Sequence, residues 1–392
     1  MEWVLPHLPH ELIFNILSRL PVKSLCRFKR VSKPWLALIT DPHFIKSHLN
    51  HQSTKDNKTQ KLILAVEWTR FSPRVYSVDY QAPDPTVFEL ELPNRRPVVK
   101  ILGSLYGILL ILTGKYLRLW NPSIKMFRKF SPPMEPEGDE LYGLGYDSVS
   151  DDFKVVTVFP FGYADGAKKS LAIDSPSVVH VFSSKLSSWK SIGFFDYCIG
   201  HDPSDRSGIA VNGAPHWIAN RLGLGMGYVI VYFDATEEKF KEVPSPCCEG
   251  EDMRDDERVH HLGVLGGWLC MVTYHRTNHA DVWVMKKYGV KESWTKLFVL
   301  PNEPGKFMPL CYASDGEVVM VLDLEKLVSY DLKECSYKTI DIALYEPYHM
   351  TFDVALYVEN LYSPHDGMGH PDQMWKLEKE VSSNLNLGES ST

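Results

Sequence analysis

The chain has 392 residues, of which 44% are hydrophobic and 23% charged, a composition typical of a globular protein with a sizeable core. No apolar run reaches the roughly eighteen residues of a membrane-spanning helix, and no secretory signal pattern is visible, so we expect neither. The seven cysteines include no Cys-x-x-Cys pair. This favours reduced thiols and a location in the cytoplasm, the nucleus or both.

Charge divides the chain into two parts. Residues 1–50 carry a net charge of +4 within a whole-chain charge of −7, so the remainder carries −11. This asymmetry predicts two units with different partners. Because the basic side chains alternate with aliphatic ones, we expect them to complement an acidic protein surface rather than nucleic acid.

Residues 8–49 have the spacing of three or four short helices separated by prolines. The first helix is expected to begin at Pro9 and the second at Pro21. Ser32 is a candidate cap for the third, and Asp41 with Pro42 for the fourth. So small a unit is only marginally stable alone, which favours completion of its core by a partner protein. A self-contained helical bundle is the alternative, and periodicity alone does not exclude it.

The order of residues in this unit adds to the argument. Leu-Pro at 8–9, RLPVKSL at 19–25, RFKRVSKPW at 27–35 and DPHF at 41–44 closely resemble the F-box of plant proteins. The resemblance implies binding to Skp1 and, through it, to a cullin–RING ubiquitin ligase. By position, the residues implied to face Skp1 are Leu8, Pro9, Leu12, Ile16, Leu17, Leu20, Pro21, Leu25, Val31 and Trp35.

Trp35 is the strongest single candidate, since large rings dominate interface energetics. Packing of Trp35 inside the helical unit is the alternative, and one ring can do both. The sequence departs from many relatives at Lys33-Pro34, where the second residue is usually serine. We expect this change to tighten the turn without removing an anchor.

From Lys61 onward, short β-branched and aromatic runs alternate with turn residues, which predicts an all-β domain. A repeated unit consists of an apolar strand, a polar turn and an aromatic residue that opens a second strand. Successive aromatics are 39 to 62 residues apart, a period that indicates a β-propeller. They are Phe88, Phe127, Trp189, Phe240, Trp294 and Tyr337. We expect them, Trp189 and Trp294 above all, to pack between neighbouring sheets.

A glycine-containing hairpin precedes most copies, so each unit supplies four strands, and residues 98–342 supply five complete blades. The first copy has only three strands, at 61–68, 75–80 and 86–92. A lone strand at 350–361 is expected to join them and close a sixth blade, which removes the exposed sheet edges.

The β-rich part also resembles a family, the F-box-associated, kelch-related domain of plants. The motifs that carry this resemblance are WNPS at 120–123, GYDSVSDDFKVV at 145–156, VNGAPHW at 211–217, LGVLGG at 262–267 and VWVMKKYGVKESWTKLF at 282–298. Together these features predict an F-box at 1–49, a linker at 50–60, a propeller for substrate recognition at 61–362 and a disordered tail at 363–392.

Candidate chemical sites are weak. His260-His261, His275 and His279 fall in strand–loop–strand sequence and lack the helical spacing of zinc ligands. We interpret them as loop histidines and predict no metal. Cys247-Cys248 are interpreted as loop thiols, and Gly223, Gly225 and Gly227 lack dinucleotide-binding spacing. No nucleophile elbow or zincin motif occurs. The sequence predicts no cofactor and no catalytic residue.

Two segments are candidates for recognition of a partner. The acidic run at 249–258 is either a solvated loop or a contact for a basic target. The segment 159–177 is a long insertion of the kind that carries recognition on rigid scaffolds.

The resemblances predict a non-catalytic substrate receptor of an SCF (Skp1–cullin–F-box) ubiquitin ligase. Its propeller is expected to bind a target protein for ubiquitination and proteasomal degradation, by proximity rather than by chemistry of its own. Neither nucleic acid nor membrane is an expected partner. The alternatives are an interaction scaffold outside any ligase and an enzyme built on the propeller.

Overall fold

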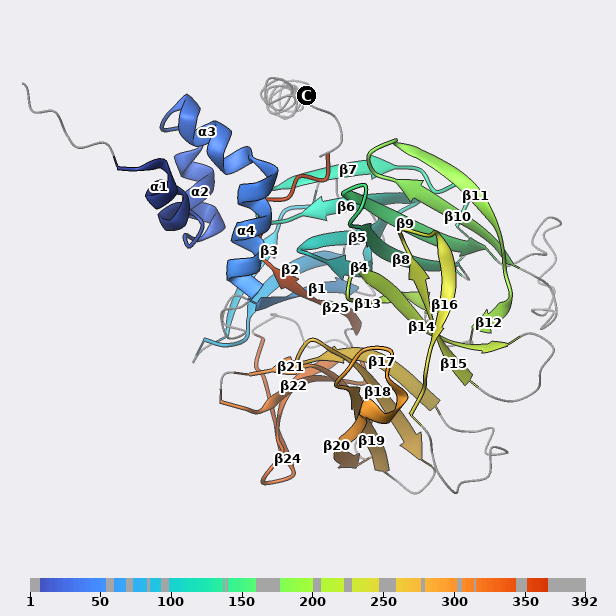
Figure 1. Cartoon of the computed structure of the whole chain (residues 1–392). Helices are drawn as coiled ribbons and strands as arrows, with labels where there is room; N and C mark the ends of the chain where they lie inside the picture. The colour runs from blue at the N-terminus through green and yellow to red at the C-terminus, as the bar shows by residue number, and fades with distance from the viewer. Residues whose placement is uncertain are drawn as a thin grey trace, which may run out of the picture.

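The computed structural model describes residues 8–53, 60–67, 73–82, 85–92, 99–136, 138, 140–159, 177–199, 206–221, 228–246, 259–275, 279–301, 305–313, 315–342 and 351–365. Several sequence predictions lie outside these residues: the paired cysteines, the glycine triplet, the acidic run, most of the insertion and linker, and most of the C-terminal tail. In the described part, short helices at the N-terminus lead into a ring of sheets (Figure 1).

The helical unit, residues 8–53, contains α1 (His10–Leu17), α2 (Val22–Phe28), α3 (Lys33–Thr40) and α4 (Pro42–Ser53). The first two helices begin one residue later than predicted, so that Pro9 and Pro21 are their N-cap residues. The predicted caps of the other two are confirmed. The Ser32 hydroxyl accepts a hydrogen bond from the Trp35 amide at 3.3 Å, and the Asp41 carboxylate accepts one from the Phe44 amide at 3.0 Å.

The remaining described chain forms six antiparallel sheets, which confirms the predicted six-bladed propeller. The sheets are β4–β7, β8–β11, β12–β16, β17–β20, β21–β24 and one made of β25 with β1–β3. The strands are β1 (Gln60–Glu67), β2 (Arg74–Asp79), β3 (Thr86–Leu90), β4 (Val99–Leu105), β5 (Ile108–Thr113), β6 (Tyr116–Asn121), β7 (Met126–Phe130), β8 (Leu141–Asp147), β9 (Asp152–Phe159), β10 (Ser177–Ser183), β11 (Ser188–Phe195), β12 (Tyr197–Ile199), β13 (Ile209–Val211), β14 (Ala214–Arg221), β15 (Tyr228–Asp234), β16 (Lys239–Val243), β17 (Val259–Leu265), β18 (Trp268–His275), β19 (His279–Met285), β20 (Trp294–Pro301), β21 (Phe307–Tyr312), β22 (Val318–Leu322), β23 (Lys326–Asp331), β24 (Ser336–Thr339) and β25 (Thr351–Val358).

The last strand closes the ring as predicted. β25 pairs antiparallel with β1 along its full length, from Gln60 opposite Val358 to Glu67 opposite Thr351. The C-terminal strand therefore joins the first three strands in one sheet. Closure of this kind covers strand edges that would otherwise be open to pairing with other chains.

Two tryptophans link neighbouring blades through the same contact. The indole N–H of Trp189 donates to the Ser131 carbonyl at 2.8 Å, and that of Trp294 donates to the Pro244 carbonyl at 2.7 Å. Both carbonyls follow the outer strand of the preceding sheet, so the predicted packing is confirmed for these rings. The predicted packing is wrong for Phe88, which is 59% exposed. The reason is that an outer strand turns only alternate side chains toward the next sheet.

A buried asparagine holds the segment that leaves β25. The Asn121 amide donates to the Asn360 side-chain oxygen at 2.9 Å and to the Tyr362 carbonyl at 2.7 Å. The Asn121 oxygen accepts from the Tyr357 hydroxyl and from the Ser123 amide, each at 2.9 Å. Since Asn121 and Asn360 are fully buried, loss of either side chain would leave polar groups without partners. The WNPS motif thus anchors the C-terminal segment of the chain through hydrogen bonds.

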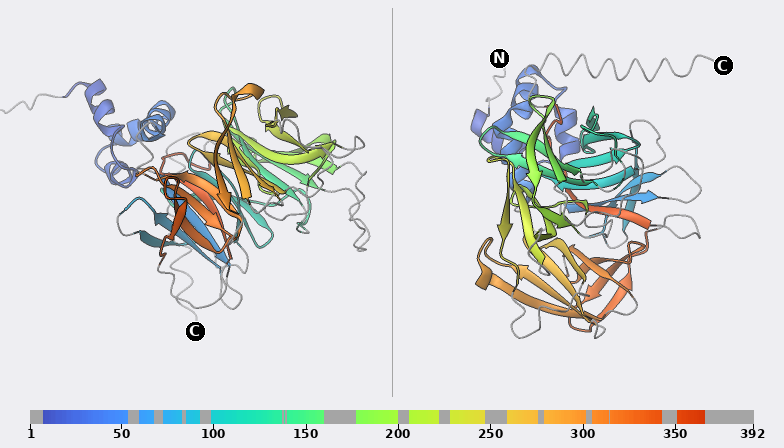
Figure 2. Two further views of the ribbon diagram at one scale, coloured as in Figure 1. Left: turned by 90° about the horizontal axis from the view of Figure 1, so that it is seen from below. Right: turned by 90° about the vertical axis from the view of Figure 1, so that its right-hand side faces the viewer.

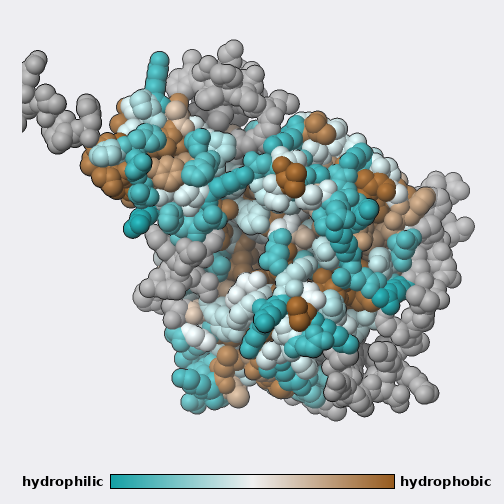
Figure 3. All heavy atoms as spheres, in the orientation of Figure 1, coloured by the Kyte–Doolittle hydropathy of each residue, from teal (hydrophilic) through white to brown (hydrophobic). Residues whose placement is uncertain are grey.

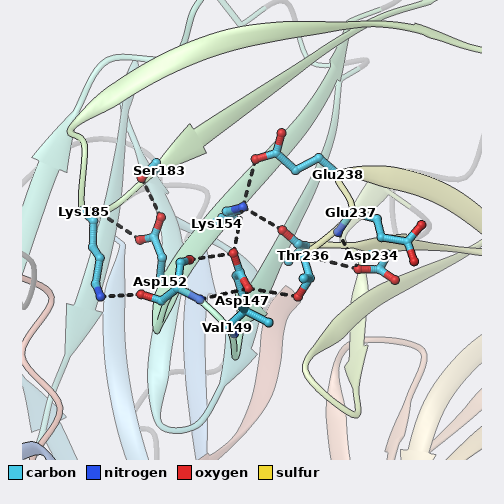
Figure 4. A network of polar contacts seen from close by, with 12 residues as sticks. Asp147, Val149, Asp152, Lys154, Ser183, Lys185, Asp234, Thr236, Glu237 and Glu238 are labelled. Atoms are coloured by element: carbon cyan, nitrogen blue, oxygen red, sulfur yellow. Dashed lines mark hydrogen bonds and ion pairs between the residues drawn. The ribbon is translucent and has the colours of Figure 1, made fainter.

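A second polar cluster joins β8–β11 to β12–β16 (Figure 4). The Lys154 ammonium lies 3.2 Å from Asp147, 2.9 Å from Glu238 and 2.8 Å from the Ala235 carbonyl. The Thr236 hydroxyl donates to Asp147 at 3.0 Å. Only 9% of the Lys154 side chain is exposed. The densely charged motif at 145–156 therefore connects two blades.

The pKa values of Asp147 and Glu238 in this cluster lie below the ordinary values of these carboxylates. Burial alone would raise the pKa of Asp147, but hydrogen bonds from Ser150 and Lys154 outweigh it and lower the pKa. Burial would likewise raise the pKa of Glu238, and contacts with Lys190 and Lys154 lower it. The cluster is fully paired in the described residues, which suits a structural joint.

We expect Gly107→Ala to destabilise the protein by about 3 kcal/mol, since it combines left-handed backbone strain with overpacking. At Gly107, where φ is +72°, an added Cβ would lie 1.8 Å from the Asn360 amide nitrogen and 2.2 Å from the Val358 carbonyl. Gly114→Ala is the matched control, with φ of +58° and nothing within 4 Å. Its cost should be about 1 kcal/mol. Equal losses in urea unfolding would contradict the proposed packing of the C-terminal segment.

We expect Lys154→Met to lower the free energy of unfolding at pH 7 by roughly 3 kcal/mol, because it leaves the buried Asp147 without a cation and Glu238 with Lys190 alone. The control is Lys190→Met. This variant removes another partner of Glu238, and the Lys190 side chain is 58% exposed. That change should cost less than about 1 kcal/mol.

The pH dependence of this cluster follows from the lowered pKa values. The two carboxylates stabilise the fold fully above their unfolded pKa values, near 4, and lose this contribution as pH falls through the lower folded values. In Lys154→Met, acid instead neutralises the Asp147 carboxylate, which has lost its cation. The stability gap between wild type and variant should therefore narrow between pH 7 and pH 4, and a widening gap would refute the assignment.

Candidate functional site

The helical unit exposes a stripe of apolar side chains on the side away from the propeller. Leu12 and Ile16, 48% and 53% exposed, are four residues apart and lie on one side of α1. Leu8, 58% exposed, lies just before the helix begins. Val31 and Leu36 add to the stripe from the start and middle of the α3 region. These five residues are called the apolar face. Hydrophobic residues, in brown, gather at the upper left of Figure 3, where Figure 1 shows the helical unit. Contiguous exposed apolar surface is typical of a protein-binding site.

The apolar face is not needed to complete the unit's own core. That core contains Leu17, Leu25, Ile39 and Phe44, each at most 2% exposed. Leu361, from beyond β25, is buried in the same cluster. The helices are therefore packed by other residues, and the exposed stripe remains free to bind a partner.

The ten residues implied to face Skp1 fall into three groups. Six are exposed, two are half-buried and two are buried in the unit's own core. The exposed ones are Leu8, Pro9, Leu12, Ile16, Pro21 and Val31, the half-buried ones Leu20 and Trp35, and the buried ones Leu17 and Leu25. Leu17 and Leu25 would support a partner contact by holding the helices. The assignment of the whole set to a partner stays a prediction.

Trp35 packs within the helical unit, as the alternative interpretation predicted, and its contact with a partner stays a prediction. Its ring meets Phe28 edge-on, with centroids 5.3 Å apart, and packs at the border of the core. The residue nevertheless remains half-exposed. Sequence reasoning did not include Leu36 in the face, because the periodicity of an eight-residue helix does not determine which apolar residue turns outward.

The helical unit is fastened to one face of the ring. Leu361 and Tyr362 pack with its core, as does Ile124 from the turn between β6 and β7. Lys46 of α4 forms an ion pair at 2.9 Å with Asp151 in the turn between β8 and β9. In the right-hand view of Figure 2, which is turned by 90° from Figure 1, the helices lie partly behind the strands. The unit thus has a defined orientation on the propeller.

The charge at this joint is well accommodated. Burial alone would raise the pKa of Asp151, but hydrogen bonds from the Tyr146 hydroxyl and from Lys46 lower it. Within the helical unit, the fully buried His48 ring lies 2.8 Å from the Leu20 carbonyl through Nε2. This contact connects α4 to the turn between α1 and α2.

The opposite face of the ring is the second candidate surface. The strands β9 and β10 enclose residues 160–176, and β16 and β17 enclose residues 244–258. In antiparallel blades these strand ends lie away from the turns that meet the helical unit. Two turns on the helical side, Tyr106-Gly107 and Gly266-Gly267, have only two residues each. Long connections on a rigid scaffold commonly carry recognition.

The described histidines and cysteines of the propeller are placed as follows. The interpretation as loop histidines is wrong for His275 and His279, which stand opposite each other on β18 and β19 with ring centroids 4.5 Å apart. His216 is fully buried, and burial lowers its pKa to about 4, so it is neutral at physiological pH. Burial raises the pKa of the Cys270 and Cys311 thiols to about 12, which makes them poor nucleophiles.

Among the described helices, none has the length and apolar content that crossing a membrane requires.

Comparison with known proteins agrees with this two-part architecture. Residues 5–47 match the F-box domain family, and residues 72–363 match the F-box associated beta propeller domain family. F-box protein CPR1 of Arabidopsis thaliana is 34% identical over 362 residues, which cover 86% of this chain and 84% of that protein. An F-box/kelch-repeat protein of the same plant is 30% identical over 377 residues, covering 93% and 98%.

Solved structures are more distant. Oligogalacturonate lyase from Vibrio parahaemolyticus aligns with a TM-score of 0.39 and 10% identity over 74% of each chain, a likeness too weak to bear on function. The family matches, in contrast, extend over both the helices and the ring. The chain belongs to the plant F-box proteins that carry an F-box associated β-propeller.

Proposed function

We propose that this chain is a substrate-receptor subunit of an SCF ubiquitin ligase. Its F-box binds a Skp1-like protein and, through it, a cullin, while its propeller binds a target protein. The observation that carries the proposal is the apolar face, which stays exposed although the F-box has a complete core of its own.

The apolar face has the strength and the surroundings for such an interface. Fully burying one Leu, Ile or Val side chain contributes roughly 1.5–3 kcal/mol, so several half-exposed ones together supply much of a stable contact. The helical unit also exposes basic residues on α2, at the start of α3 and in the turn between them, namely Lys23, Arg27, Arg30 and Lys33. They favour an acidic partner surface and speed its association.

The proposed mechanism is proximity. The ligase brings activated ubiquitin close to a target lysine, and the receptor raises the effective concentration of the two. A fixed joint between F-box and propeller suits this role, because it holds the target at a defined position. The receptor itself then needs no catalytic group, and the proposed location is the cytoplasm or nucleus.

The target is proposed to bind on the face of the propeller opposite the F-box. Support comes from the connections at 160–176 and 244–258, whose flanking strands end there. A target held on that face would leave the F-box free for its own partner. The two proposed contacts are thus made on separate surfaces of one chain.

Ile16→Asp is expected to weaken binding of a Skp1-like protein by about 30-fold or more, the loss of a ~2 kcal/mol hot spot. It should leave the unfolding temperature nearly unchanged, because Ile16 is 53% exposed. Isothermal titration calorimetry with the purified partner measures the affinity. Val149→Asp is the matched control, since Val149 is 82% exposed on the propeller and lies outside the apolar face.

Retained affinity in Ile16→Asp would refute the assignment of the face. In cells, proximity labelling should find the same target proteins with wild type and with Ile16→Asp, but the targets should be degraded only with wild type. Skp1 binding without any recovered cullin would indicate instead a scaffold outside the ligase.

A further inference from the structure

Three ligand-type side chains meet at the end of the hairpin formed by β18 and β19. One nitrogen of His275, one of His279 and one carboxylate oxygen of Asp281 all lie within 4.8 Å of one another. His275 ends β18 and His279 begins β19, directly opposite in the antiparallel register. Asp281 follows two residues later and therefore shares the face of His279. Strand pairing in the hairpin thus brings the three ligand-type side chains close together, as one face of a helix does in other metal sites.

Asp281 is an unusual member of this group. The residue is 5% exposed. Its Oδ2 atom lies 3.2 Å from His275 Nε2 and 2.6 Å from the Lys296 ammonium. Its Oδ1 atom is buried, and no donor among the described residues reaches it. A buried carboxylate oxygen without a partner is costly, so such an atom calls for a physical explanation.

We propose that His275, His279 and Asp281 form a binding site for a borderline divalent metal ion of the Zn²⁺ class. Imidazole nitrogen and carboxylate oxygen are the ligands that Zn²⁺ prefers, at about 2.0–2.2 Å. In a tetrahedral site such ligand atoms lie roughly 3.3 Å apart. Rotation of the two half-buried imidazoles would close the present spread to that value. Three protein ligands leave a fourth position for water.

The sequence argument against a metal does not apply to this arrangement. It rested on the lack of helical spacing between the histidines, whereas facing positions of an antiparallel hairpin place side chains about 4.5–5.5 Å apart at Cβ. The site lies on the propeller and is independent of the apolar face, so the inference does not depend on the proposed ligase function.

Lys296 is a built-in competitor for this site. Its ammonium occupies the same carboxylate that the metal would bind, and 43% of its side chain is exposed. It also lies 5.2 Å from the Trp283 ring, which offers an alternative position for the cation. A purely structural ion pair predicts that loss of Lys296 weakens the cluster. A metal site predicts the opposite, because removal of a competing positive charge strengthens cation binding.

The test uses the purified full-length chain, stripped of metal, with Zn²⁺ titrated against a chromophoric chelator. We expect one site per chain. His275→Ala and His279→Ala should each weaken Zn²⁺ binding by about 100-fold or more, and Asp281→Asn by about 10-fold. Lys296→Met should tighten it by about 10-fold. His10→Ala, which removes an exposed histidine of α1, is the matched control and should leave the affinity unchanged.

Co²⁺ provides a second readout, because its visible absorption reports tetrahedral coordination directly. Wild type and Lys296→Met should show this band, and His275→Ala should not. The proposal is overturned if wild type binds Zn²⁺ no more tightly than His275→Ala. It is equally overturned if Lys296→Met fails to tighten binding. Because Lys296 is partly exposed, that variant is expected to fold and keeps the test decisive.

Discussion

The structure depends on the segment 351–362, which closes the propeller and also holds the helical unit in place. β25 pairs with β1 and closes the ring, and the residues that follow it seat the F-box. Asn360 is held by Asn121, and Leu361 is buried in the core of the helical unit. Closure of the propeller and placement of the F-box are therefore a single physical event. A chain that failed to close its ring would also lose the platform for its helices.

This coupling explains how two domains of different character are held together as one unit. The F-box is small and marginal by itself, and the propeller supplies Leu361, Tyr362 and the partner of Lys46. Buried hydrogen bonds around Asn121 make the joint specific, since each lost partner leaves another polar group unsatisfied. The apolar face points away from this joint. It is thus held in position without being consumed by intramolecular packing.

Much of the fold could be predicted from the sequence because its signals are local or periodic. Helix caps at Ser32 and Asp41 and the repeat that closes with a C-terminal strand are of this kind. What escaped prediction depends on contacts between distant segments. Leu17 and Leu25 are buried in one cluster with Phe44 of α4 and with Leu361, and short helices do not reveal which side is buried. The cluster of His275, His279 and Asp281 arises from strand pairing, which spacing along the chain does not show.

Hydrogen–deuterium exchange of the full-length chain, with and without a Skp1-like protein, tests the central claim most directly. The account predicts that binding slows exchange in α1 and at the start of α3 and leaves the strands of the ring unchanged. Protection should also leave the segment 360–365 as it was, because the joint is already formed in the free chain. Unchanged exchange in α1 on binding, or protection that appears first in the propeller, would contradict the account.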